Sequence, residues 1–503
     1  MSQPQHPTSP VRDVVVLGAG PTGLTSAMML ARAGIDVVVL DRDLDEPPGT
    51  ADAAWSDWNR PGVNQFRHVH ITLPRWYRVM QAELPEVVRE LRVLGGAEVN
   101  LLHLNPASAT DGWQPGDERY TTVTGRRPVI EAALARVADA EAGVTVRRGC
   151  RVTGLVSTTD SAGNVRVVGV RAGDEVIDAD LVIDAGGRRT PVPGWLAPLG
   201  VAPLVDESVS ALSYYSRHYA GPGGPPVGSG PVLTHHESFS MLTLPADGDV
   251  WGVAIVVAAA DRSARALQDA GIWEAAARAC LPDGWLAETP ITGVRPFGGL
   301  RDIVRDYAPA GVPVLSGLVP VGDAWAATNP FLGRGLSLGT IQATVLRDAV
   351  ADAADDGPDA VCQRYAAMLR EQAEPYVRAT VSYSRHRAAQ LAAEATGQPY
   401  RSDDPAWAAS SALTAGLRED PALLRAYHEI AGALALPDDL FADPGLRARL
   451  GPWFGLSPYP ADRPGRSTLL DAIARRGADL PDAAASRAAA TPTRSNPLEG
   501  ALS

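Results

Sequence analysis

Residues 13–41 of this chain are DVVVLGAGPTGLTSAMMLARAGIDVVVLD, and this stretch decides the fold. A short apolar run leads into a glycine turn, an alanine- and methionine-rich segment follows, and a second apolar run ends at Asp41. The change from strand pattern to helix pattern and back predicts a β-strand, α-helix, β-strand unit from Asp13 to Leu40.

The turn in this unit fits the pattern GxGxxG over residues 18–23. The pattern alone is weak in a chain with 49 glycines, but its place between a strand and a helix makes it a dinucleotide-binding fingerprint. Gly18 allows the tight turn, Gly20 lets the backbone approach a pyrophosphate, and Gly23 lets the helix pack closely on the strand.

The residues that follow the turn extend the same prediction. The helix that opens at Pro21 or Thr22 would attract phosphates at its N-terminus, and Asp41 would accept hydrogen bonds from ribose hydroxyls. This fingerprint does not distinguish NAD from FAD.

A second nucleotide-type segment lies far along the chain. VPVGDA at residues 319–324 places Asp323 at a strand tip, and NPFLGRG at residues 329–335 is a glycine-rich turn that opens a long helix. Two such loops suggest one long ligand held at both ends.

With these motifs the sequence resembles the FAD-dependent monooxygenases of the aromatic-hydroxylase type (group A), and is closest in motif to bacterial polyketide epoxidases. The resemblance covers residues 11–348 and rests on the GxGxxG turn with Asp41, on GRRPVIE at residues 125–131, and on the Gly-Asp motif with the P-x-x-G-x-G turn. A segment from Arg60 to His70 is similar to the epoxidase-like branch.

The resemblance implies FAD as cofactor and a role for each matching residue. Asp323 would hold the ribityl chain, Pro330 would lie by the ring, and the backbone at Gly333, Gly335 and Leu336 would face the flavin N1–C2=O edge. Arg127 and Arg42 would meet the pyrophosphate and ribityl region. The flavin C4a-hydroperoxide is expected to carry the chemistry, so no side chain is assigned as catalytic.

One motif departs from the hydroxylase pattern. Hydroxylases usually have an Asp-Gly pair where this chain has Asp184-Ala185-Gly186-Gly187-Arg188. Electrons from NAD(P)H are therefore expected to arrive either directly or through a separate flavin reductase.

The expected fold class is α/β: a three-layer, Rossmann-type (GR2) FAD-binding domain with an inserted β-sheet substrate domain and a helical C-terminal region. The expected boundaries are 1–195 with 296–354 for FAD, 196–295 for substrate, 355–476 for the helical region, and 477–503 for a disordered tail. Candidates for the substrate wall on the inserted sheet are Tyr215, Arg217, His236 and Met241.

Composition excludes several classes of protein. The net charge of −13 disfavours nucleic acid as a partner, and no apolar run is long enough to span a membrane. All 45 basic residues are arginine, so no lysine mechanism is available, including that of flavin halogenases.

The absence of a signal pattern and the three scattered cysteines suggest a cytoplasmic protein. His68 and His70 lack a third metal ligand at a plausible spacing, so no metal site is expected.

The function predicted from the sequence is insertion of one oxygen atom from O2 into a lipophilic or aromatic small molecule, in bacterial secondary metabolism. Hydroxylation and epoxidation are both left open. The alternative is an FAD-linked oxidase or dehydrogenase, and a non-enzymatic flavin scaffold is a third reading. GLSLG at residues 335–339 matches the G-x-S-x-G of serine hydrolases, but a loop rather than a strand precedes Ser337.

Overall fold

The computed structural model describes residues 10–209, 211–226, 228, 230–459 and 463–478. At its centre is a parallel sheet with the strand order β17-β9-β1-β2-β5. The strands are β1 (Asp13–Leu17), β2 (Asp36–Leu40), β5 (Val144–Arg147), β9 (Leu181–Asp184) and β17 (Leu318–Pro320). The expected unit over residues 13–40 is present, with α1 (Pro21–Arg32) between β1 and β2. The carboxyl ends of these parallel strands bring distant segments to one edge of the sheet, where ligands bind in such folds.

Helices cover one face of this sheet and a small antiparallel sheet covers the other. Val14 and Val16 pack in a core with α1, α6 (Arg127–Ala140), α9 (Gly335–Ala353) and α10 (Pro358–Gln372). Val15 packs on the opposite side in a core with the sheet β6-β7-β8. Burial on both faces explains the unbroken valine runs of the strands. The predicted three-layer α/β fold is confirmed.

The other elements of this layered part can be given together. They are α2 (Ala51–Ser56), α3 (Pro74–Glu83), α4 (Pro85–Val93), β3 (Ala97–Asn100), α5 (Ala107–Thr110), β4 (Thr121–Thr124), β6 (Val152–Thr159), β7 (Val165–Ala172), β8 (Glu175–Asp178) and α7 (Val192–Leu196).

The inserted part is an antiparallel sheet with the order β12-β13-β14-β11-β15. Its strands are β11 (Leu212–Ala220), β12 (Leu233–His236), β13 (Phe239–Pro245), β14 (Val250–Ala258) and β15 (Arg295–Phe297). One face packs on α8 (Ala270–Cys280) and α16 (Arg466–Ala478). The other face packs in a core with Ile71, Leu73 and Phe331. A third sheet, β10 (Leu204–Val209), β16 (Arg301–Asp306) and β18 (Ala326–Ala327), connects the inserted part with the FAD-type part.

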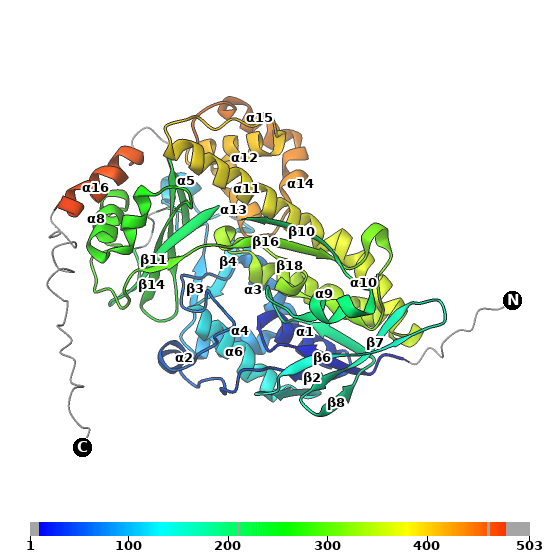
Figure 1. Ribbon diagram of the computed structural model, residues 1–503. Helices are drawn as coiled ribbons and strands as arrows, with labels where there is room; N and C mark the ends of the chain where they lie inside the picture. Colours follow the sequence, from blue (N-terminus) through cyan, green and yellow to red (C-terminus); the bar gives the residue numbers. More distant parts are fainter. Residues whose placement is uncertain (1–9, 210, 227, 229, 460–462, 479–503) are drawn as a thin grey trace, which may run out of the picture.

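The C-terminal helices form two groups (Figure 1). Helices α11 (Glu374–Ala395), α12 (Pro405–Gly416), α13 (Pro421–Ala431), α14 (Pro437–Ala442) and α15 (Pro444–Leu450) gather at the top of the view. Helix α16 lies apart from them beside α8, where its Leu469 belongs to the same apolar core as Trp273. The predicted disordered tail lies outside the described residues from position 479 onward.

No helix within the described ranges combines the length and the apolar character required to cross a bilayer.

Candidate functional site

The turn between β1 and α1 contains two glycines that leave no room for a side chain. Gly18 has a φ of +107°, and a Cβ there would lie 2.8 Å from the carbonyl oxygen of Ala185. A Cβ on Gly23 would lie 2.2 Å from the carbonyl oxygen of Gly18. A Cβ on Gly20, in contrast, would meet no protein atom within 4 Å. Gly20 is also the N-cap of α1, which has no side-chain cap. The turn therefore presents open backbone and uncapped N–H groups, which suits a phosphate.

Asp41 lies at the carboxyl end of β2 and braces this turn. Its Oδ2 accepts hydrogen bonds from Ala19 N at 2.6 Å and Arg60 Nη2 at 2.7 Å, and its Oδ1 accepts one from Asp43 N at 2.9 Å. Oδ1 keeps a lone pair that a ribose hydroxyl could use, because a carboxylate oxygen can accept two bonds.

Arg60 is the centre of a buried charge network that sequence reasoning did not assign. Its guanidinium forms ion pairs with Asp41 at 2.7 Å, Asp43 at 3.1 Å and Glu131 at 3.1 Å. Burial opposes its charge, but the carboxylates, with Glu131 the strongest, outweigh burial and raise the pKa of Arg60. Glu131 also accepts from Arg127 Nε at 2.6 Å, so the network reaches the start of α6. The sequence did not reveal this network because Glu131 lies 71 residues from Arg60 along the chain.

The second predicted loop meets the first through one side chain. Gly322 opens the 3-10 turn η5 (Gly322–Ala324) after β17 with a φ of +61°, and a Cβ there would lie 2.9 Å from Thr22 Oγ1. A Cβ on Gly339 of α9 would lie 2.2 Å from the same oxygen. Thr22 thus fills the space that two glycines leave, and it fixes α1 against η5 and α9. Asp323 follows Gly322 directly and is one-third exposed, toward the cavity.

The turn before α9 is held by side-chain bonds to its first residue. Asn329 Oδ1 accepts from Phe331 N at 2.8 Å and from the hydroxyl of Tyr214, while Asn329 N donates to Asp302 Oδ1 at 2.6 Å. Gly335 begins α9, a Cβ there would meet no atom within 4 Å, and the helix has no side-chain cap. A second open helix N-terminus therefore faces the same region as the first.

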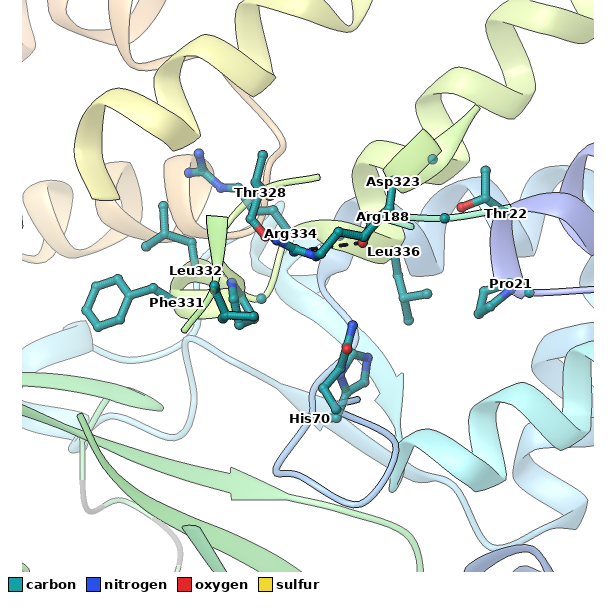
Figure 2. A pocket seen from close by; sticks show the side chains of 18 of the residues that line it. Pro21, Thr22, His70, Arg188, Asp323, Thr328, Phe331, Leu332, Arg334 and Leu336 are labelled. Carbon is teal, nitrogen blue, oxygen red and sulfur yellow. Dashed lines mark hydrogen bonds and ion pairs between the residues drawn. The ribbon is translucent and has the colours of Figure 1, made fainter. Parts of the chain in front are cut away.

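One cavity of about 860 Å³ joins these two halves (Figure 2). All residues predicted to bind the cofactor line it: Gly18, Gly20, Pro21, Thr22, Gly23, Asp41, Arg42, Arg127, Asp323, Pro330, Gly333, Gly335 and Leu336. The two uncapped helix N-termini, the two open glycines and the carboxylates at strand tips fit a long ligand with phosphates and sugar hydroxyls. These residues fit FAD.

The Asp184 loop forms another side of the cavity. Asp184 Oδ1 accepts from Gly186 N at 2.9 Å, and Thr190 Oγ1 donates to the same carboxylate at 2.8 Å. Burial raises the pKa of Asp184 to about 6, although these bonds oppose the rise. Figure 2 shows Arg188 between Asp323 and Thr328; its Nη2 donates to Thr328 O at 3.0 Å and lies 3.9 Å from Asp323 Oδ2.

Away from the dinucleotide region, the cavity continues into a chamber that we call the cap chamber. Its walls come from the inserted sheet, the turn before α9 and the C-terminal helices: Tyr214, Leu233, Leu242, Leu244, Phe331, Tyr383, His386, Trp407, Leu413 and Tyr427. Sequence reasoning missed the contribution of the C-terminal helices, for which the only signal was aromatic residues in an alanine-rich region.

The four predicted wall residues on the inserted sheet do not line this cavity, and this corrects the expectation. Tyr215 and Met241 lie in the core on the opposite face, with α8 and α16. Arg217 donates to Thr292 O at 2.9 Å, and Nδ1 of His236 lies 2.8 Å from Pro464 O. Successive strand residues alternate between faces, so the neighbours face the chamber instead.

The two histidines of the 60–70 segment are partly buried at the cavity wall. His68 Nδ1 lies 3.0 Å from Ser216 Oγ, and burial lowers the pKa of His68 to about 4. Burial also lowers the pKa of His70 to about 3. Both side chains are neutral at physiological pH, which agrees with a role in holding the loop. Within the described ranges no group of three or more His, Cys, Asp or Glu side chains could hold a metal.

Ser337 does not form a hydrolase elbow. It lies inside α9, is fully buried, and its hydroxyl has no partner among the described residues.

Comparison with known proteins agrees with this geometry. Residues 13–92 match the family described as FAD dependent oxidoreductase. Protein Rv3254 of Mycobacterium tuberculosis is 27% identical over 374 residues, which cover 68% of this chain and 73% of that protein. The probable electron transfer flavoprotein-quinone oxidoreductase YdiS of Escherichia coli is 29% identical over 196 residues, 39% of this chain and 40% of that protein.

Solved structures share the fold at low identity. PqsL from Pseudomonas aeruginosa, described as a probable FAD-dependent monooxygenase, has a TM-score of 0.55 and 18% identity, and covers 76% of this chain and 97% of its own. CmlS, a flavin-dependent halogenase, has a TM-score of 0.55 and 17% identity, and covers 94% of this chain and 78% of its own. At such identity the likeness establishes the fold alone.

Proposed function

We propose that this protein is an FAD-dependent monooxygenase that inserts one oxygen atom from O2 into a lipophilic or aromatic small molecule. We further propose that it acts in bacterial secondary metabolism and is closest to the polyketide-epoxidase branch. The observation that carries the proposal is the single cavity that joins the FAD-type half to the cap chamber. The fold shared with a probable FAD-dependent monooxygenase and a flavin-dependent halogenase supports chemistry that uses O2.

Bound FAD would supply electron transfer to O2 and oxygen transfer to the substrate. The chain would bind the FAD, orient the substrate and shield both from water. The uncapped N-termini of α1 and α9 would bind phosphate and the flavin edge. Asp323 would accept hydrogen bonds from ribityl hydroxyls. Arg127 and Arg42 would neutralise the pyrophosphate.

The cap chamber would position the substrate and exclude water. Its walls are mainly aromatic and aliphatic, which strengthens polar interactions inside it because the local dielectric is low. His68 and His70 are held neutral, so neither stores a proton near neutral pH. Positioning and shielding are then the main tasks of the protein.

We assign the proposed roles to the domains predicted from the sequence. Residues 1–195 with 296–354 would bind FAD, residues 196–295 would form one substrate wall, and residues 355–476 would form the other. NAD(P)H would be the electron source, direct or through a separate reductase, since the Asp184–Arg188 motif departs from the hydroxylase pattern.

Isotopic labelling tests the proposal. The purified protein is first denatured to measure released FAD, and the reduced holoprotein is then mixed with ¹⁸O2 and a panel of aromatic carboxylates, phenols and polyenes. We expect label in a product. Label only in hydrogen peroxide would support the oxidase alternative, and a protein without flavin would refute the proposal.

A variant of the cap chamber sharpens this test. Trp407→Ala should open the chamber to water and move label from product to peroxide. Trp113→Ala, at a site 55% exposed and outside the cavity, is the matched control.

A further inference from the structure

Arg334, in the turn that opens α9, is a buried cation in the cavity wall. The residue is 3% exposed. Its Nη1 donates to Thr380 Oγ1 at 3.1 Å, and its Nη2 donates to the carbonyl oxygen of Ile430. Its Nε has no hydrogen-bond partner among the described residues. The guanidinium is therefore anchored on one side only.

Some buried arginines of this chain have acidic partners, whereas Arg305 and Arg387 are held by neutral oxygen atoms and, unlike Arg334, do not line the cavity. Arg60 has three carboxylates, and Arg126 forms a buried ion pair with Asp247 at 2.5 Å. In the part of the chain that the structure describes, Arg334 forms no ion pair. Burying a charge without a counter-charge is strongly unfavourable, so Arg334 either serves a bound anion or is held at a cost to stability.

The surroundings of Arg334 are aromatic rather than acidic. Burial lowers its pKa to about 10, and the groups that oppose the lowering are Tyr383, Tyr376 and Tyr427. Tyr383 and Tyr427 line the cap chamber, and Tyr383 lies 5.5 Å from Trp407 between ring centroids. A ligand at this place meets aromatic rings around the charge of Arg334.

We infer that the substrate carries an anionic group, a carboxylate or a similar oxyanion, which binds Arg334, and that its aromatic or apolar body lies against the cap chamber. Nε and the adjacent Nη form the planar fork that binds a carboxylate with two hydrogen bonds. Thr380 and Ile430 fix the two Nη atoms, and Nε is the donor left without a partner among the described residues. The inference rests on the proposed function, whose substrate class it narrows.

Ligand pairs that differ only in charge test the inference without any variant. FAD-loaded protein is titrated with benzoate and benzamide, 2-naphthoate and 2-naphthamide, and 4-phenylbutanoate and its amide. The change in flavin absorbance reports binding. We expect at least one carboxylate to bind roughly tenfold or more tightly than its amide, because a charged hydrogen-bonded pair replaces a neutral one.

Two variants then locate the charge that is responsible. Arg334→Gln should remove the carboxylate preference and leave amide binding within about twofold, and Arg334→Lys should restore part of it. Arg364→Gln removes the same charge from an exposed ion pair with Asp352 and is the matched control. The midpoint potential of the flavin is measured in parallel.

The outcomes are distinct. If no carboxylate is preferred over its amide, or if the preference survives in Arg334→Gln, the inference is wrong. If Arg334→Gln shifts the flavin potential and no carboxylate preference exists, the charge of Arg334 acts on the flavin. That result also refutes the inference about the substrate. If Arg334→Gln does not fold, the wild-type pairs and Arg334→Lys still decide. A protein that contains no FAD would refute the proposed function instead.

Discussion

Replacing Gly20 by alanine separates the role of the glycine turn in ligand binding from its role in folding. The backbone at Gly20 has φ −78° and ψ 170°, which alanine adopts freely, and the new Cβ meets no protein atom within 4 Å. Alanine is a weaker N-cap than glycine, which lowers the stability of the folded protein. Replacing glycine also reduces the entropy of the unfolded chain, which raises that stability. The stability of the apoprotein should therefore change by less than about 1 kcal/mol.

The same methyl group projects into the cavity where a pyrophosphate would approach the backbone. Forcing an extra methyl into a packed contact costs about 1–3 kcal/mol, which corresponds to FAD binding weakened by roughly 5- to 150-fold. Fluorescence titration of apoprotein with FAD gives the affinity, and thermal unfolding of the apoprotein gives the stability.

Two further glycines provide controls. Gly23→Ala should destabilise the apoprotein as well, because its Cβ would lie 2.2 Å from the carbonyl oxygen of Gly18. Gly154→Ala, whose Cβ also meets nothing within 4 Å but lies on β6 outside the cavity, should change neither quantity appreciably. If Gly20→Ala binds FAD as tightly as the wild type, the dinucleotide does not lie against this turn.

Four other predictions follow from the site and its supports. Asp323→Ala should weaken FAD binding by roughly ten- to a hundredfold through loss of a charge-assisted contact; an unchanged dissociation constant would contradict the Gly-Asp assignment. Because the folded-state pKa of Asp184 is about 6 against an ordinary 3.8, the unfolded chain releases this proton first, so stability should fall as pH rises through that window. The fall is about 3 kcal/mol, and urea unfolding should show it to be absent in Asp184→Asn. Asp247→Asn leaves Arg126 without its buried partner and should cost about 3–5 kcal/mol of unfolding free energy, whereas Glu98→Gln, in an exposed pair with Arg92, should cost about 1 kcal/mol or less. Reduction of bound FAD by NADH or NADPH alone should be slow in anaerobic stopped-flow experiments and faster with substrate or a flavin reductase; rapid bleaching without either would place this protein with the self-sufficient hydroxylases.

The FAD-type half could be predicted closely because its signals are local. A glycine with a positive φ, such as Gly18, and a carboxylate at a strand tip, such as Asp323, depend on a few neighbours in sequence. The parallel sheet then brings both to the same edge without further information. For this reason every predicted cofactor residue lines one cavity.

The substrate side could not be predicted in the same way. Alternation along a strand defines two faces but not which one meets the cavity, so Tyr215 was chosen where Tyr214 lines the wall. The cap chamber also depends on how the helices after residue 373 pack over the turn before α9, and no local sequence pattern determines that packing. Arg334 belongs to a glycine-rich motif, yet its lack of an acidic partner became visible only in three dimensions.

The strand order of the central sheet has a consequence for how the chain is made. β1 is the first strand of this sheet to leave the ribosome. On one side of it the sheet continues with β9 and then β17, which are made much later, and β17 follows the whole inserted sheet. Until β9 is made, that edge of β1 has no partner, and until β17 is made, the outer edge of β9 has none. Exposed strand edges invite aggregation. Expression of this protein should therefore respond to chaperones and translation speed, and truncation before residue 318 should yield insoluble chains even though the glycine turn is complete.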